Sequence, residues 1–375
     1  MTESVPFVDL KRQFKTIEAD VRSALERVLD SQAFIMGPEV AACESELAEY
    51  VGASFGIGVS SGTDALLAAL MGLDIANGDE VIVPSFSFFA TAGAVVRIGA
   101  TPIFVDIDPV TFNLDVEHVR QSITDKTRAV IPVHLFGQSA DLGPLLIALD
   151  GMDIAIIEDA AQAIGTRYKD KHVGTFGTVG CFSFFPAKNL GAFGDGGLIV
   201  TDNADLAERI RLMRSHGAKP KYHHEIIGGN FRLDALQAAV IAAKLPYLDD
   251  WNDKRRENAK YYDDVFGQQN ISNDLLCLPK CVHGQHSYNQ YVIRSSKRDA
   301  LEQHLKKKGI GCQIYYPEPL HHQPCFKSLV PTDISLPHTE KAVGEVLALP
   351  VFPELTQNER EIVSSTVINF FRQFG

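Results

Sequence analysis

Short apolar runs of strand character alternate with amphipathic helical patterns between residues 80 and 201. The runs are EVIVP (80–84), PIFVDID (102–108), AVIPVHLFG (129–137), IAIIEDA (154–160), CFSFF (181–185) and GLIVT (197–201). Strands that alternate with helices pair in parallel and are covered on both faces, so this order predicts an α/β fold with a largely parallel sheet. Asp106, His134 and Asp159 fall near the C-terminal ends of such runs, at the sheet edge where open α/β sheets bind ligands.

The two ends of the chain have a different pattern. Residues 9–30 repeat apolar positions at helical spacing, which predicts one amphipathic helix that packs across the core or on a partner chain. We expect a large domain over residues 1–245 and a small α+β domain over residues 246–375. The elements predicted in the small domain are helix 249–265, strand 290–295, helix 297–308, strand 311–316 and helix 357–372.

Composition narrows the class of protein. The chain has 35 Lys and Arg against 47 Asp and Glu, a formal net charge of -12, and the basic run at residues 306–308 reads as a solvated helix face, so nucleic-acid binding is not expected. No apolar stretch approaches the roughly 18 residues of a membrane span, and the first residues lack the apolar core of a signal peptide. We therefore expect a cytoplasmic protein without membrane contact, with six reduced cysteines.

A turn of small residues precedes a helical pattern in GVSSGTDALLAALMGL (58–73). A glycine turn that leads into a helix N-terminus presents free backbone N–H groups to an anion. A plain helix cap by Ser61 or Thr63 explains the same residues, and this segment alone leaves both interpretations open. It is not a Walker loop, because GxxxxGK[ST] does not occur.

The apolar strand at 154–160 ends in Asp159 and a small-residue turn. An unpaired buried carboxylate is costly, so Asp159 is expected either to cap a helix or to meet a positive group of a ligand. Gln162 would lie on the same side if a helix starts here.

Lys188 is the candidate nucleophile. It follows a strand in CFSFFPAKNLGAFGDGG (181–197), where the glycine density indicates close backbone approach. A lysine held among the phenylalanines of this segment would be partly desolvated, which lowers the pKa of its amine and makes it nucleophilic. An exposed loop lysine is the alternative.

An aromatic residue could cover a planar ligand. Phe86, Phe88 and Phe89 follow a strand in PSFSFFATAGA (84–94), although core filling is the commoner role for each of them. A helix start that binds anions, a carboxylate at a strand end, an aromatic ring and a loop lysine are together the four parts that pyridoxal 5'-phosphate (PLP) requires.

Taken as a whole, the sequence resembles the fold type I PLP-dependent nucleotide-sugar aminotransferases of the DegT type over essentially its full length. The segments that carry the resemblance occur in the family's order: FVDLKRQ at the start, IMGPEV, SSGTDALLAAL, PSFSFFATA, FVDID, IEDAAQAIG, FSFFPAKNLGAFGDGG, GGNFRLDALQAA and YYPEPLHHQP. The resemblance implies a mostly parallel seven-stranded sheet in the large domain.

By that resemblance, Lys188 would form the Schiff base with PLP and would move a proton as general acid and base. Asp159 would pair with the pyridine nitrogen, Phe88 would stack on the ring, and Gln162 would lie beside the cofactor. The implied reaction takes an amino group from glutamate, gives 2-oxoglutarate, and passes the amine to a keto sugar carried on a nucleotide, for glycan or secondary-metabolite biosynthesis.

The phosphate site follows in the same way. Gly62, Thr63 and Ser183 match phosphate-binding positions of the family. Asn230 matches an asparagine that reaches the phosphate from the neighbouring subunit, which implies a homodimer with shared active sites.

Substrate contacts are less specific. Arg232, His321 and His322 lie in segments that resemble substrate-facing loops, with a surface ion pair and ordinary loop histidines as alternatives. Tyr222-His223-His224 is similar to a stretch in relatives that act at the sugar 3-position.

Other chemistries have weaker support. Cys277, Cys281, His283 and His286 fit no common zinc spacing, so no metal site is predicted. Neither a GxGxxG fingerprint nor a GxSxG elbow is present. A PLP enzyme with another substrate and a non-catalytic regulatory protein of this fold are the alternatives. A dehydratase branch with histidine in place of the lysine is disfavoured by Lys188.

Overall fold

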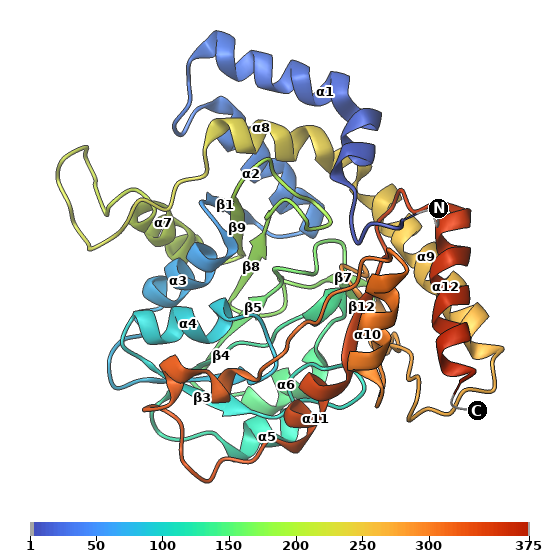
Figure 1. Ribbon diagram of the computed structural model, residues 1–375. Helices are drawn as coiled ribbons and strands as arrows, with labels where there is room; N and C mark the ends of the chain where they lie inside the picture. The colour runs from blue at the N-terminus through green and yellow to red at the C-terminus, as the bar shows by residue number, and fades with distance from the viewer. Residues whose placement is uncertain (1–3, 374–375) are drawn as a thin grey trace.

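A seven-stranded sheet forms the centre of the computed structural model, which describes residues 4–373 (Figure 1). The strand order is β1-β9-β8-β5-β4-β2-β3, and β9 alone runs against the other six. The predicted mostly parallel sheet is therefore confirmed. Its strands are β1 (Phe55–Val59), β2 (Glu80–Pro84), β3 (Thr101–Val105), β4 (Thr127–Val130), β5 (Ala155–Asp159), β8 (Val179–Ser183) and β9 (Gly197–Thr201).

Helices cover both faces of this sheet. One layer consists of α2 (Pro38–Val51), α5 (Val116–Gln121), α6 (Leu142–Leu149) and α8 (Ala235–Lys244), and the other of α3 (Gly62–Gly72), α4 (Ala90–Arg97) and α7 (Ala204–Met213). In β2, Ile82 packs into the first layer, whereas Val81 and Val83 pack into the second. Successive side chains of a strand point to opposite faces, so the apolar runs of the sequence fill two cores at once.

The predicted N-terminal helix is α1 (Leu10–Ser31), which lies along α8 outside the sheet (Figure 1). Asp9 caps it by accepting hydrogen bonds from the first backbone amides. Its buried residues Ile17 and Val21 pack against Val240 of α8. No helix among residues 4–373 is long and apolar enough to cross a membrane.

The C-terminal part has its own apolar core, which also includes Val5 from the start of the chain. The boundary between residues 245 and 246 stays a prediction, and the outermost residues of both predicted domains (1–3 and 374–375) lie outside the described residues. The elements here are α9 (Leu248–Gly267), β11 (Tyr291–Arg294), α10 (Arg298–Lys307), α11 (Pro337–Glu345), β12 (Val346–Leu349) and α12 (Gln357–Phe371).

Short elements join the two parts. A three-stranded sheet pairs β10 (Gly284–Gln285) with β6 (Arg167–Tyr168), which pairs with β7 (Lys171–His172). The 3-10 turns are η1 (Leu135–Gly137), η2 (Leu245–Tyr247), η3 (Leu320–His322) and η4 (Pro324–Phe326).

The strand predicted at 311–316 is wrong. The partner of β11 is β12, and within residues 4–373 the 311–316 segment makes a single bridge, from Gln313 to Ala348. Its backbone hydrogen-bonds to two different segments: Gly311 donates to the carbonyl of Val5, and Gln313 exchanges hydrogen bonds with Ala348. Alternating apolar residues are present, but no single strand lies beside them for long enough to form a ladder.

A buried carboxylate, Glu158, fixes the end of β5. Its oxygens accept from His134 Nε2 at 2.9 Å and from the backbone amides of Gly174, Phe176 and Gly177 at 2.6–2.7 Å. Burial alone would raise the pKa of Glu158, but the hydrogen bond and charge interaction with His134 and the amide donors outweigh it and lower the pKa. Glu158 therefore stabilises the strand end that carries the next residue, Asp159.

Replacing Glu158 with Gln is expected to lower the free energy of unfolding by about 3 kcal/mol at pH 7, because the amide cannot serve as acceptor for all four donors. Since the folded-state pKa of Glu158 is lowered, its contribution is complete above the ordinary glutamate pKa of about 4.3 and is lost as pH falls through the folded value. Urea denaturation across this range measures both effects. Glu361 is exposed and serves as the control. This role would be contradicted if Glu361→Gln lowered the free energy of unfolding as much as Glu158→Gln does. It would also be contradicted if the difference in unfolding free energy between the wild type and Glu158→Gln stayed the same at acid pH.

Candidate functional site

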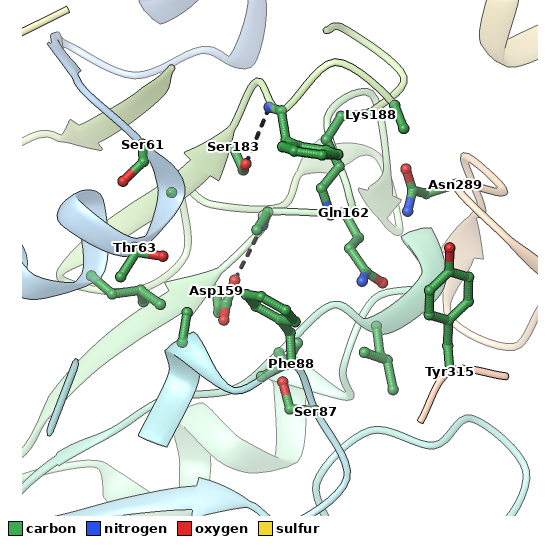
Figure 2. Close-up of a pocket in the computed structure, with 18 of the residues that line it drawn as sticks. Ser61, Thr63, Ser87, Phe88, Asp159, Gln162, Ser183, Lys188, Asn289 and Tyr315 are labelled. Atoms are coloured by element: carbon green, nitrogen blue, oxygen red, sulfur yellow. Dashed lines mark hydrogen bonds between the residues drawn. The ribbon is translucent and has the colours of Figure 1, made fainter. Parts of the chain in front are cut away.

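A cavity of about 460 Å³ opens at the C-terminal ends of β2, β5 and β8 (Figure 2). This is the sheet edge at which the sequence predicted a ligand site. The residues that line the cavity are Ser61, Gly62, Thr63, Leu66, Ser87, Phe88, Ala90, Val133, Leu135, Asp159, Ala161, Gln162, Ser183, Phe185, Ala187, Lys188, Asp195, Asn289, Gln290, Tyr315 and Tyr316.

Lys188 lines the cavity from the loop after β8 (Figure 2). Its backbone N–H donates to the carbonyl of Phe185 at 2.8 Å, which closes a turn at the start of this loop. The side chain is partly accessible through the open cavity, but the protein packed around the amine desolvates it and lowers its pKa to about 8, against the opposing charge of Asp159. More of the amine is therefore neutral near physiological pH than in an ordinary lysine, and the neutral form is the nucleophile.

Asp159 is the last residue of β5 and faces the same cavity. Oδ2 accepts from Thr91 Oγ1 at 2.8 Å, and Oδ1 accepts from the backbone amide of Ala161 at 3.2 Å. Burial raises the pKa of Asp159, while these hydrogen bonds and the charge of Lys188 oppose the shift. A cationic group bound beside this carboxylate would favour its ionised form, because opposite charges within about 4–6 Å lower a carboxyl pKa.

The hydroxyl groups of Ser87 and Thr91 form a chain of hydrogen bonds that ends at Asp159. Thr91 Oγ1 lies 2.8 Å from Ser87 Oγ. The single hydroxyl hydrogen of Thr91 is used toward Asp159, so Ser87 must donate to Thr91. Both hydroxyls therefore orient the carboxylate and leave it as an acceptor toward the cavity.

The start of α3 and the end of β8 form a small cradle in the cavity wall. Ser61 caps the helix by accepting from the amide of Asp64 at 3.0 Å, and no residue of the described range accepts from the amides of Gly62 and Thr63. A Cβ added to Gly62 would lie 2.6 Å from Ser183 Cβ, so this close approach requires glycine. Ser61 therefore caps the helix, and the amides of Gly62 and Thr63 are still free to bind an anion beside the Ser183 hydroxyl. The two interpretations of this segment are compatible.

Phe88 and Gln162 occupy other walls of the cavity (Figure 2). The Phe88 side chain is 56% exposed, whereas nearby Phe86 is only 1% exposed and fills the core. The amide of Gln162 is held at both ends, because Oε1 accepts from the backbone N–H of Phe136 at 2.7 Å and Nε2 donates to the hydroxyl of Tyr316 at 3.0 Å.

Asn230 and Arg232 lie outside this cavity. Asn230 is exposed, and its backbone bridges to Ser215. Arg232 lines a neighbouring polar hollow of about 410 Å³ that shares Ser61 and Asp195 with the cavity. Within the part of the chain that the structure describes, its guanidinium makes no ion pair, so a surface ion pair does not account for it.

His321 and His322 are also not brought into the cavity. His321 is buried with its Nδ1 2.5 Å from Ser85 Oγ, and burial lowers the pKa of its imidazole, whereas His322 is exposed. Among the described residues, the only His, Cys, Asp or Glu group compact enough for one ion is His321, His322 and Glu340. The set considered from the sequence, Cys277, Cys281, His283 and His286, is not such a group.

Several residues that line the cavity, or that hydrogen-bond to a residue lining it, were not singled out from the sequence. Asn289 and Gln290 precede β11, and their only local signal is a polar pair before a strand. Tyr315 and Tyr316 begin the segment YYPEPLHHQP, which resembles the family, but nothing in that segment assigns a role to their rings. Thr91 and Ser87 are short hydroxyl residues near a helix start, where a capping role is the ordinary expectation.

Comparison with known proteins places these features in a family. Residues 15–368 match the model of the DegT/DnrJ/EryC1/StrS aminotransferase family. A relative from Geobacillus stearothermophilus, named "Pleiotropic regulatory protein", is 46% identical over 99% of this chain and 100% of its own length. A relative from Acidithiobacillus ferrooxidans, named UDP-N-acetyl-3-dehydro-alpha-D-glucosamine 3-aminotransferase, is 41% identical over 97% of both chains.

Solved structures agree with this placement. The crystal structure of DesV from S. venezuelae in complex with a ketimine intermediate superimposes with a TM-score of 0.95, at 40% identity, over 98% of this chain and 99% of that one. The family model matches nearly the whole chain, and the relatives are more than 30% identical to it. Together these matches establish the family of this chain. The chain belongs to the DegT/DnrJ/EryC1/StrS aminotransferase family, whose cofactor is PLP.

Proposed function

We propose that this chain is a PLP-dependent aminotransferase that moves an amino group from glutamate to C3 of a nucleotide-linked keto sugar. The product would be an amino sugar for glycan or secondary-metabolite biosynthesis. The observation that carries the proposal is one cavity in which a lysine with a lowered pKa, a buried carboxylate and a helix start with free amides face each other. The 41% identical 3-aminotransferase supports the choice of C3.

The residues of the cavity fit the cofactor at both of its ends. The free amides of Gly62 and Thr63 and the Ser183 hydroxyl would hold the phosphate, since helix N-termini bind anions. Asp159 would face the ring nitrogen, and Phe88 would cover the ring. When bound, PLP supplies an electron-accepting ring that takes up negative charge as a bond to the reacting carbon breaks.

The residues of this chain would divide the remaining work. Lys188 would hold the cofactor covalently and, once displaced by the substrate amine, would carry a proton to and from the reacting carbon. In the cofactor-free cavity the pKa of its amine is lowered to about 8, toward the operating pH at which a general acid and base works best. Gln162, fixed between Phe136 and Tyr316, would keep its place beside the cofactor without reorganising.

For the sugar substrate, we propose that Asn289, Gln290 and Tyr315 contribute polar contacts. Asn289 and Tyr315 lie across the cavity from the cradle (Figure 2), and Gln290 lines the cavity next to Asn289 in the sequence. Arg232 is a further candidate contact, since its guanidinium lines the hollow that adjoins the cavity and has no ion-pair partner among residues 4–373. His321 would reach a substrate only after a local change at Ser85, and the exposed His322 lies outside the cavity, so both have less support than these residues.

We further propose a homodimer in which Asn230 of each chain completes the phosphate site of the other. Asn230 is exposed and lies outside its own cavity, as a residue that serves a neighbouring subunit must. The hollow beside Ser61, with Arg232 in its wall, leaves room for an approaching segment of a second copy.

A regulatory protein is the second candidate, because the 46% identical relative carries that name. A protein that only keeps the fold has no need of a desolvated lysine opposite a buried carboxylate. The retained cavity chemistry therefore favours the enzyme.

The function is tested by following the two half-reactions separately. Glutamate added to the holoenzyme should change the cofactor's absorption and release 2-oxoglutarate, and a 3-keto nucleotide sugar should then be aminated faster than its 4-keto isomer. Absence of any change with amino donors, in protein that holds PLP, would favour the regulatory candidate.

In that assay, Asp159→Asn should bind PLP but react with glutamate roughly two orders of magnitude more slowly, because the amide cannot hold a proton on the ring nitrogen by charge. Asp106→Asn is the matched control. Asp106 is a buried carboxylate just after β3 that accepts from the amides of His338 and Thr339, away from the cavity. Equal rates for the two variants would make Asp159 a structural cap.

Lys188 is expected to be the residue that binds PLP, as borohydride reduction followed by peptide mapping would show. Lys244 provides a stringent internal comparison, because burial lowers the pKa of its amine to about 8 as well, but its Nζ donates to Gly191 O and lies outside the cavity. Label on Lys244 would mean that a low pKa, rather than position in the cavity, selects the lysine.

Mixing inactive Lys188→Ala chains with inactive Asn230→Ala chains should restore part of the activity, because one of the two sites in a hybrid dimer has both residues intact. Subunit exchange is verified by a mass tag on one variant. Exchange without recovery would contradict a shared site.

A further inference from the structure

Asn189, the residue after Lys188, makes buried side-chain hydrogen bonds that have no part in the chemistry proposed above. Asn189 is 3% exposed, and its Nδ2 donates to Asn252 Oδ1 at 2.6 Å and to the Ser287 carbonyl at 2.9 Å. Its own Oδ1 is buried without a hydrogen-bond partner in the described structure. The side-chain amide of Asn189 thus holds the loop that carries Lys188 through its two donors, in addition to the backbone bonds on either side.

Asn252 continues this connection. It lies on α9 and is 1% exposed, and its Nδ2 donates to the carbonyl of Ile164 at 3.2 Å. The Ser287 and Ile164 carbonyls can only accept hydrogen bonds, so they fix the orientations of the Asn189 and Asn252 amides, respectively. The two amides therefore form one directional chain, from the Lys188 loop to the turn after Asp159.

The approach of that turn to α9 is tight. Gly165 has φ +83°, and a Cβ at this position would lie 2.2 Å from Asn252 Nδ2. The turn therefore adopts a backbone conformation that L side chains rarely adopt, and it does so where it meets the Asn252 amide. Gln162, in the same turn, lines the cavity.

The same helix also holds the opposite cavity wall. Arg255 lies almost one turn further along α9, and its Nη1 donates to the carbonyls of Tyr288 and Asn289 at 3.1 and 3.3 Å. Asn289 itself lines the cavity. One face of α9 thus contacts three segments that carry cavity residues: the Lys188 loop, the Gln162 turn and the segment before β11.

We propose that Asn252 is a positioning residue for the aminotransferase reaction: through Asn189 it fixes the Lys188 loop relative to Asp159 and so preserves the packing that desolvates the lysine amine. This inference rests on the proposed function. The Coulomb interaction between Lys188 and Asp159 and the desolvation of Lys188 both depend on the place of this loop. Removing the Asn252 amide leaves Asn189 with the Ser287 carbonyl alone.

The test compares Asn252→Leu with Asn258→Leu as holoenzymes. Asn258 is a matched control on the same helix: it is 3% exposed, and its Nδ2 donates to the Phe352 carbonyl at 2.9 Å, in the C-terminal core. Both variants lose a buried amide, so both should melt at lower temperature. Only Asn252→Leu should change the chemistry of Lys188.

Two readouts separate positioning from stability. The pH midpoint of the cofactor's absorption band should rise by roughly half a unit or more in Asn252→Leu, because water admitted to the site favours the charged form of the nitrogen that joins Lys188 to the cofactor. The rate of the glutamate half-reaction at saturation should fall about tenfold, with its half-saturating concentration changed less than about threefold. Asn258→Leu should leave both values as in the wild type.

A conservative variant guards against loss of folding. Asn252→Asp keeps an acceptor for Asn189, so its absorption midpoint should lie closer to the wild type than that of Asn252→Leu. Equal midpoints in the wild type and both Asn252 variants, or equal shifts in Asn252→Leu and Asn258→Leu, would overturn the inference. If the wild type itself carries no cofactor on Lys188, the proposed function fails instead, which the peptide map distinguishes.

Discussion

A lysine amine and a carboxylate that the surrounding protein desolvates face one cavity, and the rest of the site depends on keeping them there. Each has a cost that the fold must offset, because charged groups removed from water are destabilised. Lys188 responds with a pKa lowered to about 8, and Asp159 is held by Thr91 and the amide of Ala161. The arrangement is stable only as a set, since each group favours the ionised form of the other.

The architecture supplies this constraint from several directions. Parallel strands end at one edge, so Asp159, the last residue of β5, and Ser183, the last residue of β8, both lie there, with Ser183 two residues beyond Cys181, the partner of Asp159. The buried Glu158 network holds the β5 end from within the sheet. Helix α9 reaches the same edge from the C-terminal part and contacts the Lys188 loop through Asn252.

How much of this was predictable depends on the sequence separation of the contacts. Lys188, Asp159 and Gly62 were identifiable because each sits in a local pattern of strand, turn and glycine, and the helix over 9–30 followed from its apolar spacing. Thr91 reaches Asp159 across 68 residues, and Gln162 reaches Tyr316 across 154, so no local pattern shows those pairs. The strand expected at 311–316 failed for the same reason, since its pairing partners are set by distant segments.

The most direct measurement of the central claim is the pKa of the Lys188 amine in the cofactor-free chain, from the pH dependence of competitive amine labelling followed by peptide mass analysis. The account predicts a midpoint of about 8 in the wild type. It predicts a lower midpoint in Asp159→Asn, because the carboxylate favours the charged amine. A midpoint near the ordinary lysine value of 10.5, or one that Asp159→Asn leaves unchanged, would contradict it.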